Sequence, residues 1–210
     1  MLGVLAWVSL SHAWADLLQL QASAIIEGWG RTPQARGAKA LALVQSRLAR
    51  ADQLRPGDPT IAQDLGRLHQ LRSFALPGID SAAAAAELRQ ALRYYQRSVR
   101  LRPTSPHMWA NIAVMHSHLG LLDAGLVRAI DNAALLGPWE PEVQLALADI
   151  GFRNWEALPK ASRDTIWQNL YRGLKHNDAR MFDSAFRHAR LDVMCATPGV
   201  VRSKLALRCI

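Results

Sequence analysis

The feature that most constrains the fold of this chain is a six-residue pattern, Leu-x-Pro-x-x-Pro, which occurs at residues 54–59, 101–106 and 136–141. The first proline ends a helix, because it has no backbone N–H and its ring disfavours helical geometry in the preceding residue. The second proline suits the first turn of a new helix, where no N–H is needed. Each copy therefore predicts a short joint between two helices.

The spacing of the three copies predicts a structural repeat. Leu101 and Leu136 are 35 residues apart, whereas Leu54 and Leu101 are 47 apart. A tetratricopeptide (TPR) helix pair has a period of about 34 residues, so the longer interval contains about 13 extra residues. We assign them to residues 73–85, which contain Pro77-Gly78 and an alanine run. The spacing predicts a short array of helical repeats with one loop insertion.

Composition and periodicity favour an all-α fold. The 210-residue chain is 50% hydrophobic. It is rich in Ala, Leu, Arg and Gln, which favour helices, and no stretch alternates as a half-buried strand does. We expect eight to ten antiparallel helices and no sheet. The expected segments are 16–28, 34–54, a helix from Pro59, 81–101, a helix from Pro106, 122–136, 142–153, a pair around Trp155 and Trp167 with Pro159 between and Ser162 as N-cap, and 178–194.

Small and large residues recur at matching places in the expected helix pairs. Leu65-Gly66 and Ile112-Ala113 occupy one pair of positions, and Tyr95 is a bulky residue in a returning helix. The chain resembles TPR proteins over residues 34–153, which implies an α-α solenoid whose helical-repeat domain covers residues 16–194. The resemblance also implies a protein-binding groove lined by the first helix of each pair. Its lining residues would include Gln63, Arg67, Gln70, His107, Ser117, Asp149 and Phe152.

A narrower resemblance covers about residues 101–209. It rests on Trp109-Ala-Asn-Ile-Ala113, Gly137-Pro-Trp-Glu-Pro-Glu-Val-Gln-Leu145 and the stretch Leu191-Asp-Val-Met-Cys195, with Cys209 beyond it. In these the chain resembles the VpsP-type proteins of bacterial exopolysaccharide gene clusters. The resemblance implies an exported, non-catalytic accessory factor in polysaccharide production.

The N-terminus indicates export. Residues 1–10 are apolar, and Ala13-Trp14-Ala15 fits a signal-peptidase site. No Lys or Arg precedes the apolar run, so residues 1–15 are interpreted as a signal peptide or an uncleaved N-terminal anchor. An anchor would contact the inner membrane through residues 1–26, and a buried first helix is the alternative. Either export reading places the protein in the periplasm, released or membrane-anchored.

The two cysteines, Cys195 and Cys209, enclose 13 residues that include Pro198-Gly199. No other pairing exists within the chain, and Pro-Gly can reverse its direction. In an oxidising compartment we expect a disulfide that closes the tail, residues 195–210. In a cytosolic protein the same residues would be two free thiols.

The formal charge is +8, with an isoelectric point near 10.3. Such a surface can bind nucleic acid or another anionic polymer, which is the alternative function. The charges are scattered, however, and also fit an ordinary solvated surface. We therefore expect no specific nucleic-acid partner.

No phosphate-binding, metalloprotease or nucleophile-elbow motif occurs in the chain. His116 and His118 are two residues apart, so on a helix they point about 200° apart and cannot share a metal. Trp109, Trp155 and Trp167 fit core positions, whereas Trp139, between two prolines, is unexplained. The sequence predicts a scaffold that is not an enzyme and has no cofactor, catalytic residue or metal site. Its expected partner is another protein of an envelope or exopolysaccharide assembly, itself held in a membrane.

Overall fold

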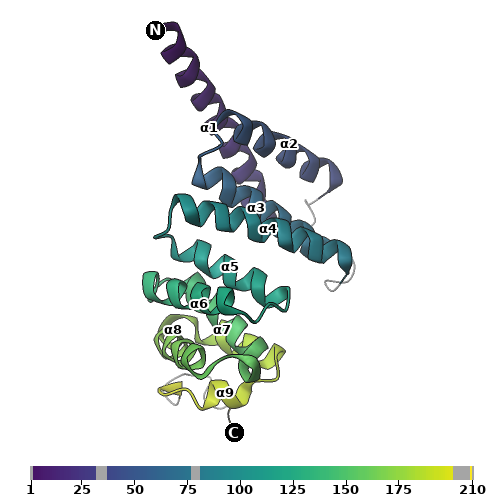
Figure 1. Ribbon diagram of the computed structural model, residues 1–210. Coiled ribbons are helices and arrows are strands. Elements are labelled where there is room, and N and C mark those ends of the chain that lie inside the picture. Colours follow the sequence, from purple (N-terminus) through teal and green to yellow (C-terminus); the bar gives the residue numbers. More distant parts are fainter. Residues whose placement is uncertain (1, 32–36, 77–80, 201–208, 210) are drawn as a thin grey trace. The chain divides into compact units, whose positions relative to one another are not determined.

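A computed structural model of the chain describes residues 2–31, 37–76, 81–200 and 209. Within these residues the chain forms nine α-helices and no strand, so the all-α prediction is confirmed there (Figure 1). The helices pack in sequential antiparallel pairs, α1 with α2, α3 with α4, α5 with α6 and α7 with α8. Their bounds are α1 Leu2–Arg31, α2 Ala38–Leu54, α3 Pro59–Ala75, α4 Ala82–Leu101, α5 Pro106–His118, α6 Ala124–Leu136, α7 Pro141–Asn154, α8 Lys160–Arg187 and α9 Leu191–Cys195, with a short 3-10 helix, η2, at Trp155–Ala157.

The chain divides into two compact units, Met1–Pro103 and Thr104–Ile210. The first contains α1 to α4, and part of its core is a cluster of apolar residues from α1, α2 and α3. The second contains α5 to α9 and has its own buried apolar residues on each helix. The cluster in the first unit consists of Ala15, Ala22, Ile26, Trp29, Val44, Leu48, Ala51, Ile61, Leu65 and Leu68. The buried residues of the second include Met115, Ile130, Leu147, Phe152, Ile166, Leu170, Met181 and Phe182.

All three proline patterns mark helix boundaries as predicted. Helices α2, α4 and α6 end at the leucine of each pattern, and α3, α5 and α7 begin at its second proline. At the first joint Asp58 caps α3, because its carboxylate accepts hydrogen bonds from the backbone N–H groups of Thr60 at 2.7 Å and Ile61 at 3.2 Å. The boundaries follow from the local chemistry of proline, which tertiary packing does not alter.

The small residue expected at the α3–α4 contact is required there. A Cβ built on Gly66 would lie 2.7 Å from Cε1 of Tyr95, which is itself 1% exposed. The equivalent residue of α5, Ala113, is fully buried. The close approach of α3 and α4 therefore depends on the absence of a side chain at Gly66.

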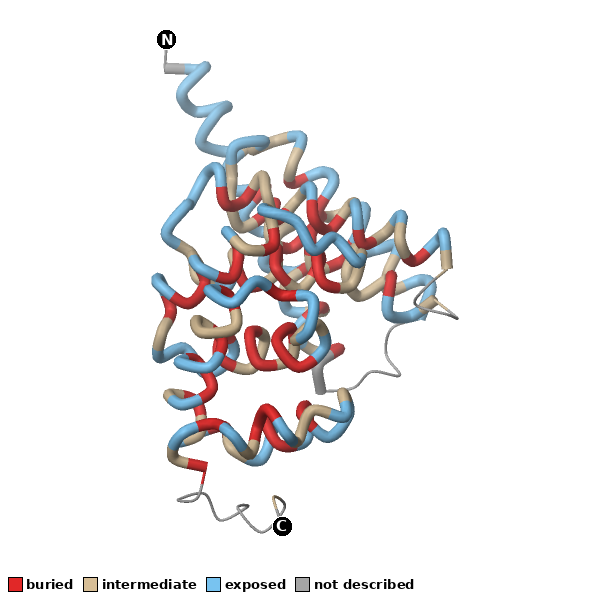
Figure 2. The backbone as a smooth tube through the Cα atoms, turned by 60° about the horizontal axis from the view of Figure 1, so that its bottom comes forward, coloured by how far each residue is buried: buried red, intermediate tan, exposed pale blue. Residues whose placement is uncertain are grey.

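The first helix is longer than expected. Instead of a separate segment followed by a helix at 16–28, α1 is continuous over 30 residues, and Gly28 lies inside it. A glycine costs only about 1 kcal/mol in a helix, which packing of the adjacent Trp29 offsets. From Ala15 onward one side of α1 is buried, whereas its first turns project from the first unit and are exposed (Figure 2). No helix in the described part of the chain combines the length and apolarity needed to cross a membrane.

The expected loop insertion at 73–85 is helical at residues 73–75 and 82–85. Residues 73–75 complete α3, and the alanine run forms the first turn of α4, capped by Ser81. The hydroxyl of Ser81 accepts a hydrogen bond from the N–H of Ala84 at 3.2 Å. The helix expected at 81–101 is α4, which begins where Ser81 caps the alanine run, and the difference from expectation is at residues 73–75, which complete α3. Residues 77–80 lie outside the described part.

Of the expected last helix pair, the member at Trp155 is only the short 3-10 helix η2, and the member at Trp167 is α8, a single helix of 28 residues. Pro159 immediately precedes α8, and Ser162 is buried within its first turn instead of capping it. The expected helix at 178–194 is the end of α8 followed by α9. The two are separated where Ala189 has a left-handed backbone conformation, with φ of 54°.

Candidate functional site

Three residues predicted to line a groove lie on α3 of the first unit, and all three are half-buried. The side chain of Gln70 forms a hydrogen bond within the first unit: its Oε1 accepts from the hydroxyl of Tyr95 at 2.6 Å. Burial raises the pKa of that tyrosine, which keeps the donor protonated. Gln63 and Arg67 remain partly accessible to solvent. These two residues are the part of the predicted set that a partner can reach on this unit.

The other four predicted residues lie in the second unit, and they do not form one exposed surface. His107 is exposed at the start of α5, but Phe152 is 1% exposed and Ser117 is 7% exposed. The hydroxyl of Ser117 accepts a hydrogen bond from Nδ2 of Asn154 at 2.7 Å. Ser117 and Phe152 therefore serve internal packing in this structure, which repeat positions alone did not reveal.

Asp149, the fourth of these residues, connects α7 to the end of α8. Its Oδ1 accepts a hydrogen bond from Ser184 at 2.6 Å and lies 3.1 Å from Nε2 of His188 and 3.3 Å from Nη2 of Arg187. Burial alone would raise the pKa of Asp149, but the hydrogen bonds from Ser184 and His188 and the two nearby cationic side chains lower it overall. The Asp149 carboxylate therefore links α7 to the C-terminal end of α8 through these hydrogen bonds and ion pairs.

An open groove in the second unit brings three aromatic side chains together. We call it the aromatic groove. It has a volume of about 780 Å³, and its rings are unusually accessible, with Trp139 70%, Tyr171 56% and Trp167 37% exposed. Its lining residues are Trp139, Asp164, Trp167, Gln168, Tyr171, Arg172 and Pro198. Apart from Trp139 and Pro198 they all come from α8, where Trp167 and Tyr171 are one turn apart.

A buried polar network fixes the joint that carries Trp139. The side chain of Gln144 donates a hydrogen bond to the carbonyl of Pro138 at 3.0 Å and accepts one from Nδ2 of Asn177 at 3.1 Å. On the other side of the joint, a Cβ built on Gly137 would lie 2.6 Å from Cβ of Pro106. The backbone beside Trp139 is therefore held by buried hydrogen bonds and by close packing.

The rings of the groove have defined neighbours. Trp167 packs edge-to-face against Trp155, with ring centroids 6.1 Å apart. The guanidinium carbon of Arg172 lies 5.8 Å from the centroid of the Trp139 ring, within the range of a cation–π interaction. These contacts orient the two indoles and leave substantial ring surface open to solvent.

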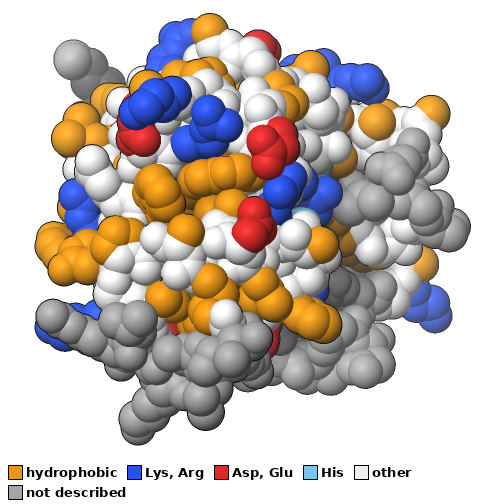
Figure 3. Space-filling view, turned by 90° about the horizontal axis from the view of Figure 1, so that it is seen from below, with side chains coloured by type: hydrophobic (Ala, Val, Ile, Leu, Met, Phe, Trp, Pro, Cys, Tyr) orange, Lys and Arg blue, Asp and Glu red, His pale blue; other side chains and the backbone are white. Residues whose placement is uncertain are grey.

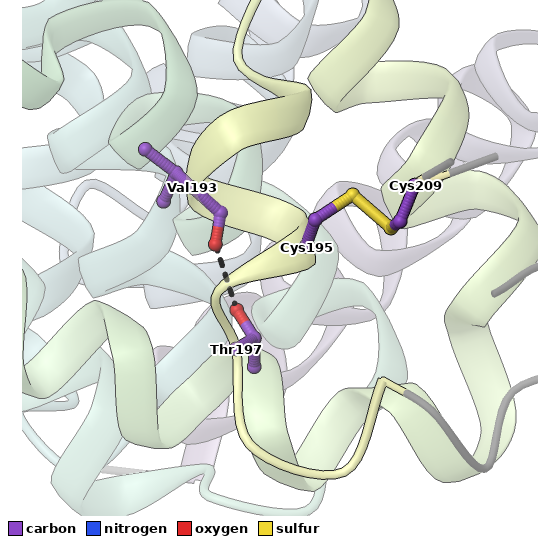
Figure 4. The surroundings of a disulfide bond; sticks show 4 residues. All are labelled: Val193, Cys195, Thr197 and Cys209. Atoms are coloured by element: carbon purple, nitrogen blue, oxygen red, sulfur yellow. Dashed lines mark hydrogen bonds between the residues drawn. A yellow bond between two sulfur atoms is a disulfide. The ribbon is translucent and has the colours of Figure 1, made fainter.

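The disulfide predicted between Cys195 and Cys209 is present, with a Cα–Cα distance of 5.6 Å (Figure 4). It joins the end of α9 to the last described residue, and Thr197 donates a hydrogen bond to the carbonyl of Val193 at 3.1 Å in the turn that follows. Gly199 has φ of 88°, and a Cβ there would lie 3.2 Å from the ring of Tyr171. The start of the closed tail thus packs against the aromatic groove.

The first turns of α1, residues 3–14, form a second unusual surface, which we call the apolar tip. Gly3 to Leu10 are all exposed, and the large apolar side chains are spread around the helix, because successive residues are 100° apart. The first charged residue is Asp16, which pairs with Arg55 at 2.6 Å. The exposed fractions are Val4 68%, Leu5 62%, Trp7 72%, Leu10 69% and Trp14 54%.

The described residues contain no cluster of three or more His, Cys, Asp or Glu side chains that could hold a metal ion. His116 is buried, with Nδ1 at 3.1 Å from Oδ1 of Asp123. Burial, reinforced by the charge of Arg153, lowers the pKa of His118.

The basic side chains are mixed with acidic ones on the face shown in Figure 3. Several arginines form ion pairs with carboxylates, which reduces the positive potential available to an anionic polymer. The pairs include Arg97 with Asp52 at 2.6 Å, Arg180 with Glu142 at 2.9 Å and Arg190 with Glu156 at 3.1 Å.

Trp139 is the groove residue that the sequence leaves unexplained, whereas Trp167, which is expected in the core, is 37% exposed. The buried stripe of α8 includes Ile166, Leu170 and the polar residues Asn169 and Asn177, and Trp167 lies at the edge of this stripe. Because polar residues occupy core positions, the hydrophobic period of α8 is weak and its faces cannot be assigned from sequence.

No family model matches the chain, and comparison with curated proteins found no match.

Proposed function

We propose that this protein is a non-catalytic, TPR-like scaffold that is held at the bacterial inner membrane by α1 and binds another protein of envelope or exopolysaccharide assembly. The observation that carries the proposal is the apolar tip. Large apolar side chains exposed in a continuous group are unusual in a soluble protein and mark a surface that another phase or partner covers.

A lipid bilayer suits the apolar tip better than a single protein groove. A groove would cover one stripe of the helix, whereas the apolar side chains of the tip surround it. Residues 3–14 are about 18 Å long as a helix, which is enough to enter one leaflet of a hydrocarbon core about 30 Å thick. Trp7 and Trp14 are of the residue type that favours the membrane interface.

The remainder of α1 connects the membrane contact to the scaffold. Ala15, Ala22, Ile26 and Trp29 are buried in the first unit, so the tip and the unit share one continuous helix. The disulfide supports the periplasmic side of the membrane, because such bonds persist in oxidising compartments. The helix pairs and the close contact at Gly66 support a TPR-like scaffold, whose reachable surface includes Gln63 and Arg67.

The membrane contact is tested by flotation of the detergent-purified full chain with vesicles of phosphatidylethanolamine and phosphatidylglycerol. We expect the protein to float, and Leu10→Asp to lower its partition about tenfold or more, because a charge replaces a side chain whose burial is worth about 1.5–3 kcal/mol. Leu135→Asp is the matched control, since Leu135 is 76% exposed on α6 and Leu10 is 69% exposed. Equal flotation of both variants, or no flotation of the wild type, would contradict the proposal.

A further inference from the structure

We propose that the aromatic groove binds a neutral oligosaccharide, with Trp139, Trp167 and Tyr171 as stacking surfaces and Asp164, Gln168 and Arg172 as hydrogen-bonding groups. This inference goes beyond the scaffold function and does not depend on it. The groove lies wholly within the second unit, whereas the membrane contact belongs to the first.

The exposed rings are the first reason. Large aromatic side chains are costly to leave in water unless a ligand or partner covers them. The face of an aromatic ring carries negative charge density, so it attracts C–H groups that bear partial positive charge. A pyranose ring presents such C–H groups on its faces and hydroxyl groups around its edge. A groove with several open rings therefore fits a chain of sugar units.

The polar lining is the second reason. Asp164 contributes an acceptor, Arg172 contributes donors, and Gln168 contributes both. Sugar hydroxyls both donate and accept, so each of these groups finds a partner on the edge of a sugar ring. Binding sites for small ligands commonly combine an apolar lining with a few such polar groups.

The charges of the groove separate this ligand from other occupants of aromatic grooves. The lining contains one carboxylate, which pairs with Lys160 at 2.6 Å, and one guanidinium, which is little positive charge for the phosphates of a single-stranded nucleic acid. A proline-rich peptide also docks on aromatic rings, but its prolines offer no N–H donor to Gln168 or to Asp164, whose Oδ2 already accepts a hydrogen bond from Lys160 at 2.6 Å. A neutral, hydroxyl-rich ligand satisfies the whole lining.

The groove is organised before any ligand binds. Gln144 and Asn177 fix the joint that carries Trp139, and Trp155 supports Trp167. Arg172 lies over the Trp139 ring and so holds its orientation. Rigid aromatic surfaces lower the entropic cost of binding, which matters for weak ligands such as oligosaccharides.

The test uses the indole N–H signals in NMR spectra of the isotope-labelled full-length protein. The probes are cellohexaose, mannohexaose and chitohexaose, each added to about 10 mM, which saturates a site of about 1 mM affinity. Decaproline and a thymidine decanucleotide are the non-sugar probes. We expect the signals of Trp139 and Trp167 to shift saturably with at least one hexasaccharide, while those of Trp29 and Trp109 stay in place.

Variants identify the groove as the site. Trp139→Ala should weaken binding about tenfold, because it removes one stacking surface, whereas Trp139→Phe should retain most of the affinity. Phe186→Ala is the matched control, since Phe186 is 71% exposed, lies outside the groove, and should leave binding unchanged. The proposal is overturned if no hexasaccharide shifts the two indoles, if Trp139→Ala binds as the wild type does, or if only decaproline or the decanucleotide binds.

Discussion

Gly66→Ala is the most direct test of how α3 and α4 pack. The added Cβ would lie 2.7 Å from Cε1, 2.8 Å from Cδ1 and 3.1 Å from Cζ of Tyr95, whereas carbon atoms normally approach to about 3.5 Å. The ring cannot easily retreat, because it is 1% exposed and its hydroxyl is bonded to Gln70 at 2.6 Å. Overpacking of this kind costs about 1–3 kcal/mol.

The helix propensity of alanine opposes this cost. Alanine is favoured over glycine by up to about 1 kcal/mol in a helix interior, so the expected net loss is about 1 kcal/mol. Gly28→Ala is the matched control, because Gly28 is also helical and a Cβ there meets nothing within 4 Å. Chemical denaturation should show Gly28→Ala stabilising and Gly66→Ala destabilising, about 1–3 kcal/mol apart. If the two substitutions stabilise the protein equally, the proposed close contact does not exist.

Three further substitutions or treatments probe other elements. Asp123→Ala removes the N-cap of α6, whose carboxylate accepts from the N–H of Leu126 at 3.1 Å, and should cost about 1 kcal/mol in chemical denaturation. Burial raises the pKa of Asp64, so its protonated form stabilises the fold at low pH, and this contribution is lost as pH rises through the raised pKa. Asp64→Asn should remove that slope from the pH dependence of the unfolding free energy; an unchanged slope would refute the assignment. Reduction of the Cys195–Cys209 disulfide should lower stability by about 3 kcal/mol, and thiols that titrate in protein isolated without reductant would show that the bond does not form.

Helix boundaries set by local chemistry could be predicted from the sequence. The proline joints were correct because proline acts through its own backbone geometry, whatever surrounds it. The disulfide was predictable because the chain has only two cysteines. The extent of α1 was not, because Gly28 weakens a helix by an amount that packing around Trp29 can overcome.

The aromatic groove could be predicted only in part. Trp139 was conspicuous between two prolines, but nothing in the sequence placed it near Tyr171. That proximity depends on Gln144 and Asn177, polar residues whose burial is visible only when the hydrogen bonds between α7 and α8 are known. Repeat positions likewise could not show that Phe152 would be buried.

The scaffold proposal is tested most directly by photo-crosslinking in native cells. A photoreactive amino acid would replace Gln63, a half-buried residue of the expected binding surface on α3, or Gln90, a half-buried control on α4. The account predicts one discrete adduct with another protein from Gln63, recovered in the membrane fraction, and none from Gln90. Identical adduct patterns from both positions, or no adduct from Gln63, would contradict a scaffold that binds its partner through α3.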